Sequence, residues 1–262
     1  MIKEYIEYLR YTKGYSENTI KSYETCLRNF TKSMAVYQLR WSTINQNHIQ
    51  NYLSSVLANG KSASTIVQYI SAIRGLYRWI GNKYGIENPT RYLQAPKKTS
   101  LIPHIIDVES VSKAILNESD EQIRIGIALM VGVGLRVSEV LSMRYEDIDR
   151  VSGRVLIMGK GRKERYIYLP QPILLMLTKD AGHIISYQDR AFRYMVYLAF
   201  RRIGVYCSPH MLRHTFASMA IDNGMRLDVL REVLGHTSLA TTQIYLHTRQ
   251  SVVREEMRKC IV

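Results

Sequence analysis

The sequence lacks the features that would place a protein in a membrane or outside the cell. No segment reaches the roughly 18 apolar residues that a membrane-spanning helix needs, and residues 1–5 form no apolar signal region. Cysteine is scarce, and Cys26, Cys207 and Cys260 are odd in number and far apart, which argues against a disulfide framework. We therefore expect a protein of the reducing cytoplasm, with no membrane association.

Patterns for two kinds of cofactor site are also missing. The sequence has no Gly-x-x-x-x-Gly-Lys-[Ser/Thr] loop, so we expect no nucleotide-phosphate site. His210 and His214 have the i, i+4 spacing of zinc ligands on a helix, but Met211 stands where a metalloprotease motif has glutamate. We expect neither a metal nor another cofactor.

Positive charge is what the sequence has in excess. Its 36 Lys and Arg residues outnumber 22 Asp and Glu residues, which gives a formal net charge of +14 at pH 7. Such a balance favours a polyanionic partner, above all a nucleic acid. At 262 residues the chain is long enough for two modest domains.

Hydrophobic spacing predicts two mostly helical regions. Helical periodicity runs through the first region, residues 1–87. The segment that follows holds Pro89 and Pro96 and then the basic pair Lys97-Lys98, so we interpret residues 88–103 as a linker. The second region, residues 104–262, begins with helices and is predicted to be helical again from residue 189 to the end.

Two β-branched segments in the second region, residues 154–158 and 165–169, are predicted to form a hairpin with a glycine-hinged basic tip. The predicted fold class is therefore mostly α, with a small β-sheet in the C-terminal domain (α+β).

Residues 210 to 245 concentrate groups that can bind and attack a phosphate. His210 and Arg213 are three residues apart, so on a helix both can reach a single phosphate. His236 follows a glycine, and Tyr245 carries a hydroxyl that can act as a nucleophile. In so basic a chain, these groups indicate a nucleic-acid backbone as the substrate.

The sequence contains five short motifs: Gly134-Leu-Arg136-Val-Ser-Glu139, Gly159-Lys160-Gly161, His210-x-x-Arg213-His214, Leu234-Gly235-His236 and Tyr245. In order and spacing they resemble the motifs of the tyrosine site-specific DNA recombinases, the phage-type integrases, with the Xer-type recombinases closest in layout. The resemblance covers nearly the whole chain. It implies a helical, SAM-like core-binding domain that binds DNA over residues 1–87, a catalytic domain over 104–262, and closure of the two as a C-shaped clamp around the duplex.

The residue types fit cleavage of a phosphodiester by a tyrosine hydroxyl. Arg136 and Arg213 would neutralise the non-bridging oxygens, because a guanidinium is permanently charged and forks onto paired oxygens. Lys160 at the hairpin tip would protonate the leaving 5′-oxygen. The resemblance implies that Tyr245 is the nucleophile and forms a 3′-phosphotyrosyl bond, so that neither metal nor ATP is needed.

Supporting roles are assigned to the remaining polar residues. His210 either accepts the tyrosine proton or donates a hydrogen bond to phosphate, and the sequence leaves both open. His236 would donate a hydrogen bond to a phosphate oxygen, and Glu139 would support Arg136 by an ion pair. His214 would either pack against its neighbours or support a residue that contacts the phosphate. The residues expected to contact DNA without taking part in the chemistry are Lys97, Lys98, Arg162, Lys163 and Arg165.

Two other functions share part of this pattern. A type IB topoisomerase has the same active-site set, but the short layout and the helical N-terminal domain favour a recombinase. A non-catalytic DNA-binding regulator would not require the phenol of Tyr245.

The resemblance also bears on assembly and location. It favours a tetramer on two paired DNA sites, in which a short helix around residues 252–259 docks on a neighbouring protomer rather than on its own domain. Accessory DNA-bending proteins or a partner recombinase would fit such a complex. The protein would then act in the cytoplasm, at the nucleoid.

Overall fold

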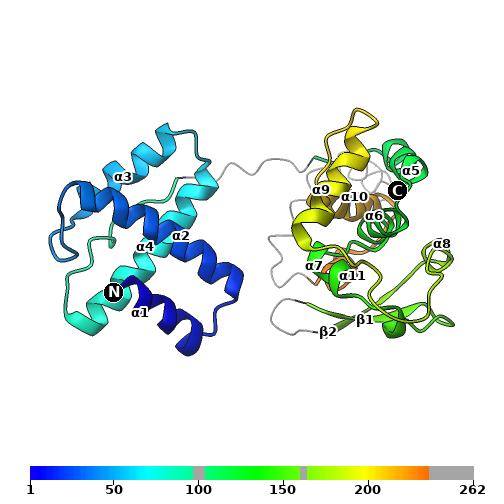
Figure 1. Cartoon of the computed structure of the whole chain (residues 1–262), viewed down its shortest axis with the longest axis horizontal. Helices are drawn as coiled ribbons and strands as arrows, with labels where there is room; N and C mark the ends of the chain where they lie inside the picture. Colours follow the sequence, from blue (N-terminus) through cyan, green and yellow to red (C-terminus); the bar gives the residue numbers. More distant parts are fainter. Residues whose placement is uncertain (97–103, 160–163, 236–262) are drawn as a thin grey trace, which may run out of the picture. The chain divides into compact units, whose positions relative to one another are not determined.

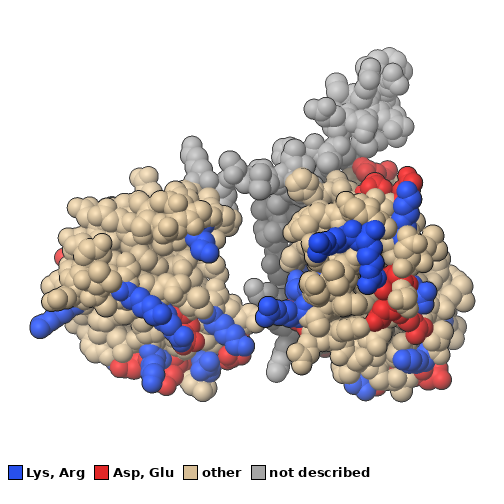
Figure 2. All heavy atoms as spheres, turned by 45° about the horizontal axis from the view of Figure 1, so that its top comes forward, with Lys and Arg blue, Asp and Glu red and all other residues tan. Residues whose placement is uncertain are grey.

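The computed structural model describes residues 1–96, 104–159 and 164–235. The chain divides into two compact units, Met1–Ser100 and Leu101–Val262 (Figure 1). No helix in the described part combines the length and the hydropathy that crossing a membrane requires. Lys and Arg side chains lie on the drawn face of each unit, interspersed with Asp and Glu (Figure 2).

In the described part of the first unit the regular elements are all helical, and the helices pack around one apolar core. Ser16, Asn45 and Ser62 are N-caps whose side chains accept a hydrogen bond from a backbone N–H of the first turn, which fixes where three of the helices begin. The core includes the fully buried Phe30 and Tyr77. The elements are α1 (Ile2–Glu7), the π-helical turn η1 (Tyr8–Thr12), α2 (Glu17–Val36), α3 (Gln46–Ala58) and α4 (Ala63–Tyr84).

The second unit is built around one buried helix, α6 (Glu121–Val133). Ile123, Ile125 and Ile127 of α6 are fully buried although they point to different sides of the helix, because other helices cover α6 on several sides. Around it lie α5 (Val108–Asn117), α7 (Val137–Ser142), the 3-10 turn η2 (Tyr145–Asp147), α8 (Gln171–Leu174), α9 (Asp189–Arg201), α10 (Pro209–Asp222) and α11 (Leu227–Leu234).

Strands β1 (Arg154–Met158) and β2 (Glu164–Tyr168) form an antiparallel two-stranded sheet in the second unit. The register pairs Arg154 with Tyr168 and Met158 with Glu164. Side chains alternate across a strand, so Val155, Ile157 and Ile167 join the core while their neighbours face outward. The predicted fold class, mostly α with a small sheet in the C-terminal unit, is confirmed. The second strand begins one residue earlier than predicted.

Candidate active site

The turn between α6 and α7 positions the first predicted arginine. Gly134 ends α6 in the left-handed conformation, with φ of +69°, and a Cβ there would lie 2.3 Å from the Phe216 ring. Both the backbone angle and the close packing therefore require glycine. Arg136 follows as the N-cap of α7, and Glu139 lies in the first turn of that helix.

Glu139 is a buried carboxylate, 3% exposed, at the centre of the cluster. Arg136 donates to it twice, from the backbone N–H to Oε2 at 2.9 Å and from Nη1 to Oε1 at 2.7 Å. The ion pair predicted between these two residues is thus present. The side chain of Arg136 remains 27% exposed, so a ligand can still reach it.

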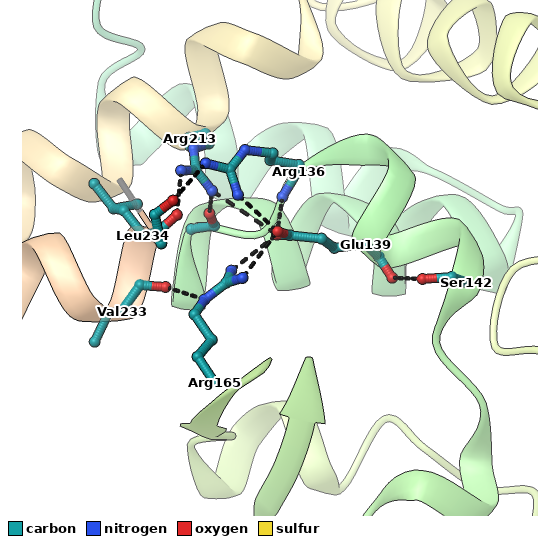
Figure 3. Close-up of polar contacts among 9 residues, drawn as sticks. Arg136, Glu139, Ser142, Arg165, Arg213, Val233 and Leu234 are labelled. Atoms are coloured by element: carbon teal, nitrogen blue, oxygen red, sulfur yellow. Dashed lines mark hydrogen bonds and ion pairs between the residues drawn. The ribbon is translucent and has the colours of Figure 1, made fainter. Parts of the chain in front are cut away.

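Arg213 is buried within α10 and comes to the same place from another direction (Figure 3). Its Nη1 donates to the Gly134 carbonyl at 2.5 Å and its Nη2 to the Leu234 carbonyl at 2.6 Å. Nη1 also lies 3.9 Å from Oε2 of Glu139. The two arginines predicted to act on one phosphate therefore share one carboxylate.

Arg165 is a third arginine on Glu139, and its position differs from the sequence interpretation. We predicted a DNA contact, but its side chain is only 8% exposed. Nη1 and Nη2 fork onto Oε1 and Oε2 of Glu139, each at 2.9 Å, and Nε donates to the Val233 carbonyl at 2.7 Å. The reason is strand alternation: Arg165 lies on the same side of β2 as the buried Ile167, so it faces the interior.

The charges explain how the carboxylate remains ionised. Burial alone raises the pKa of Glu139, but hydrogen bonds from Arg165 and from the Arg136 backbone, together with the charges of both guanidiniums, outweigh it. The net effect lowers the pKa of Glu139. Three guanidiniums around one carboxylate leave the cluster with an excess of positive charge, which suits a phosphate ligand.

His210 and His214 lie on α10 beside this cluster. His210 is exposed, yet partial desolvation and the charges of Arg193, Arg213 and Arg136 lower its pKa. Its imidazole is therefore neutral at pH 7 and offers one nitrogen as a proton acceptor. The pKa of His214 is also lowered, by burial and by His210 and Arg213.

The other predicted site residues lie outside the described residues. The tip of the predicted hairpin lies in the sequence between Met158, which ends β1, and Glu164, which begins β2. The segment that begins with His236 directly follows Gly235. The residues outside are Lys97, Lys98, Lys160, Arg162, Lys163, His236 and Tyr245. Within the described ranges, no group of three His, Cys, Asp or Glu side chains is placed to hold a metal ion.

Comparison with protein families matches both units. The model described as "Phage integrase family" matches residues 107–251, and that of "Phage integrase, N-terminal SAM-like domain" matches residues 2–83. Among curated proteins, the chain is 28% identical to the tyrosine recombinase XerD of Staphylococcus haemolyticus and 29% identical to that of Staphylococcus aureus (strain Mu50). Each alignment covers 97% of this chain and 96% of the relative.

Solved structures share the fold. XerH bound to a palindromic difH substrate matches with a TM-score of 0.74 at 21% identity, over 98% of this chain and 84% of that one. A lambda integrase dimer bound to a core site matches with a TM-score of 0.78 at 18% identity, over 95% of each chain. At such identities the likeness is one of fold.

Proposed function

Because the chain belongs to the phage integrase family, we propose that it is a site-specific DNA recombinase that cleaves and rejoins duplex DNA through a 3′-phosphotyrosyl intermediate. The observation that carries the proposal is the convergence of Arg136 and Arg213 on Glu139, with His210 of α10 beside them. Such a cluster can bind a phosphodiester and stabilise the charge that develops on it during in-line attack.

The proposed cleavage step forms one bond and breaks another at the same phosphorus. The hydroxyl oxygen of Tyr245 bonds to phosphorus, and the bond to the 5′-oxygen breaks. His210 accepts the tyrosine proton, and Lys160 donates a proton to the leaving 5′-oxygen. Arg136 and Arg213 bind the non-bridging oxygens, on which negative charge increases.

Rejoining is the reverse reaction with the 5′-hydroxyl of another strand as the nucleophile. His236 would add a hydrogen bond to the phosphate in both directions. The phosphotyrosyl bond conserves the energy of the broken strand, so the reaction balances without ATP, and the arginines and Lys160 supply the charge that a metal ion would otherwise provide.

We propose duplex DNA at a specific core site as the partner, with a tetramer on two paired sites as the active assembly. XerH and lambda integrase were solved on DNA, the latter as a dimer on a core site. Lys97, Lys98, Arg162 and Lys163 would contact the DNA backbone, and the helix around residues 252–259 would dock on a neighbouring protomer. Accessory DNA-bending proteins or a partner recombinase would act with this assembly at the nucleoid.

A type IB topoisomerase and a non-catalytic regulator are less well supported. The XerD relatives align over nearly their whole length, which favours recombination over relaxation by a monomer. A regulator would not need two arginines, Arg136 and Arg213, paired with the same carboxylate. Contacts that only position a protein on the DNA backbone do not require two guanidiniums at one phosphate.

The proposal is tested with nicked suicide duplexes that carry a randomised core, because the target sequence has to be selected along with the activity. Wild-type protein should form a denaturant-resistant adduct with a subset of duplexes, and Tyr245→Phe should form none. Sequencing the trapped DNA gives the site, and two copies of that site on a plasmid then separate recombination from relaxation. An adduct formed by Tyr245→Phe would contradict the assignment of the nucleophile.

A further inference from the structure

The C-terminal end of α11 is held by three arginines from three different elements. Arg165 donates to the carbonyl of Val233, and the next carbonyl, that of Leu234, accepts from Arg213. The carbonyl of Gly235 accepts from Nη2 of Arg136 at 3.1 Å. The last carbonyls of a helix have no partner within it and carry partial negative charge, so guanidiniums are suitable ligands for them.

Arg165 differs from Arg136 in having its guanidinium directed inward, and it is buried to the same degree as Arg213, whose side chain is 7% exposed. Its Nε, Nη1 and Nη2 each donate to an internal acceptor, and its side chain is 8% exposed against 27% for Arg136. Its fork occupies both oxygens of Glu139, the carboxylate to which Arg136 and Arg213 are also paired. Arg165 therefore contacts the groups that position the two phosphate-binding arginines.

We propose that Arg165 is a positioning residue for strand cleavage: it fixes Glu139 and the end of α11, so that Arg136 and Arg213 present their guanidiniums to the same phosphate. This inference rests on the proposed recombinase function. It replaces the DNA contact that the sequence predicts for this residue. It also links β2 to the end of α11, through the Val233 carbonyl.

The geometry gives two physical reasons for this role. Without Arg165, the carboxylate of Glu139 would lose two of its hydrogen bonds and would attract Arg136 and Arg213 more strongly, away from a phosphate. The Val233 carbonyl would lose its donor, which would loosen the end of α11. Gly235 fits the same arrangement, since a Cβ at that position would lie 3.1 Å from Nη1 of Arg165.

The test compares Arg165→Met and Arg165→Lys with Arg154→Met. Arg154 is an exposed arginine on the partner strand β1, stacked over the Tyr166 ring at 5.0 Å, so its removal takes the same charge from the same hairpin without touching Glu139. Three quantities are measured on the selected site: the single-turnover cleavage rate, the affinity for the duplex, and the dependence of that affinity on salt.

For a positioning residue, Arg165→Met should lower cleavage by about 100-fold, the size expected for misplaced reacting groups. Its DNA affinity and salt slope should match those of Arg154→Met. Arg165→Lys keeps the charge but not the fork, so it should cleave at an intermediate rate. If Arg165 contacted DNA, Arg165→Met would instead weaken binding. The slope of the logarithm of the binding constant against the logarithm of the salt concentration would then fall in magnitude by about 1. That result, or an unchanged cleavage rate, would overturn the proposal.

Two further arms keep the outcome interpretable. If Arg165→Met does not fold, Arg165→Lys carries the test, with loss of cleavage at unchanged affinity as the supporting result. If wild-type protein forms no adduct, the recombinase function fails, and the internal pairing is then tested by a double-mutant cycle of Arg165 with Glu139. Coupling of about tenfold or more in the unfolding equilibrium supports the contact, and additivity contradicts it.

Discussion

At the scale of single residues, the central feature is one buried negative charge shared by three guanidiniums. An isolated carboxylate in this place would be protonated, because burial opposes the charged form. Arg165 and Arg136 reverse this at Glu139, whose pKa is lowered, and Arg213 lies 3.9 Å from the same carboxylate. The carboxylate in turn allows three positive charges to lie together before any phosphate is bound.

Replacing Glu139 with Gln should therefore destabilise the second unit severely. The variant keeps the shape of the side chain but leaves three guanidiniums without their counter-charge, and breaking a buried ion pair in this way costs about 3–5 kcal/mol. Glu146→Gln is the matched control, since it removes an exposed carboxylate that is paired with Arg144 at 2.6 Å. The control should change stability little.

The measurement has to report on the second unit alone. Both tryptophans, Trp41 and Trp79, lie in the first unit, so intrinsic fluorescence follows the wrong part of the chain. Hydrogen exchange of the α6 amides in increasing urea reports on the second unit. Equal effects of the two substitutions would mean that the burial of Glu139 has no energetic consequence.

His210 predicts a pH dependence of cleavage. Its lowered pKa keeps the imidazole neutral at pH 7, and a neutral ring can accept the tyrosine proton. The cleavage rate should be constant above the ordinary histidine value of about 6.5 and should fall as pH drops through the lowered pKa.

Single-turnover rates between pH 5 and 8 check this assignment. His210→Gln should cleave slowly, and its rate should no longer fall at low pH. Arg193→Gln removes a charge that repels the protonated imidazole, so the fall in rate should move to higher pH. An unchanged fall in rate in His210→Gln would assign the titration to another group and favour the role of phosphate donor.

Part of this site could be predicted from the sequence. The motif spacing predicts the ion pair of Arg136 with Glu139, because residues three apart meet at the start of a helix. The inward position of Arg165 was missed because the residue was assigned a DNA contact, although its alternation with Ile167 in the predicted strand 165–169 could have indicated an inward side chain. The contact to Val233 could not be foreseen, since it depends on where α11 packs.

At the scale of elements, the join between α6 and α7 sets the place of the first arginine. Long helices with polar caps were predictable, because periodicity and caps are local properties. Short elements such as η2 (Tyr145–Asp147) and α8 (Gln171–Leu174) were not, since three or four residues cannot establish a period. Gly134, between α6 and α7, is decisive because only glycine both adopts the left-handed backbone conformation easily and leaves room for the Phe216 ring.

Gly134→Ala should therefore destabilise the second unit more than a glycine substitution with backbone strain alone. The left-handed conformation costs about 1–2 kcal/mol for alanine, and insertion against the Phe216 ring adds about 1–3 kcal/mol of overpacking. Gly224→Ala is the control, because Gly224 has φ of +86° with no heavy atom within 4 Å of the added Cβ. Urea unfolding followed by α6 hydrogen exchange should rank the two, and equal losses would contradict the packing argument.

At the scale of the whole molecule, family matches lie within each of the two units. The family was predictable from five short motifs because each fixes a chemical group at a set distance along the chain. The predicted linker, residues 88–103, contains the division between the units, but its role as a linker stays a prediction.

Assembly is tested by removing residues 250–262. If the helix around residues 252–259 docks on a neighbouring protomer, the truncated protein should bind one half-site as wild type does but should lose cooperative assembly on paired sites and recombination. Native gels with one and two half-sites measure this directly. Normal four-subunit complexes and normal strand exchange would show that this segment does not couple the protomers.

The central claim is that Tyr245 attacks DNA to form a 3′-phosphotyrosyl bond, and mass spectrometry of the trapped adduct tests it most directly. After digestion with nuclease and protease, the account predicts one modified peptide, with a nucleotide joined through its 3′-phosphate to Tyr245. A nucleotide on another of the 19 tyrosines, or one joined through a 5′-phosphate, would contradict the account.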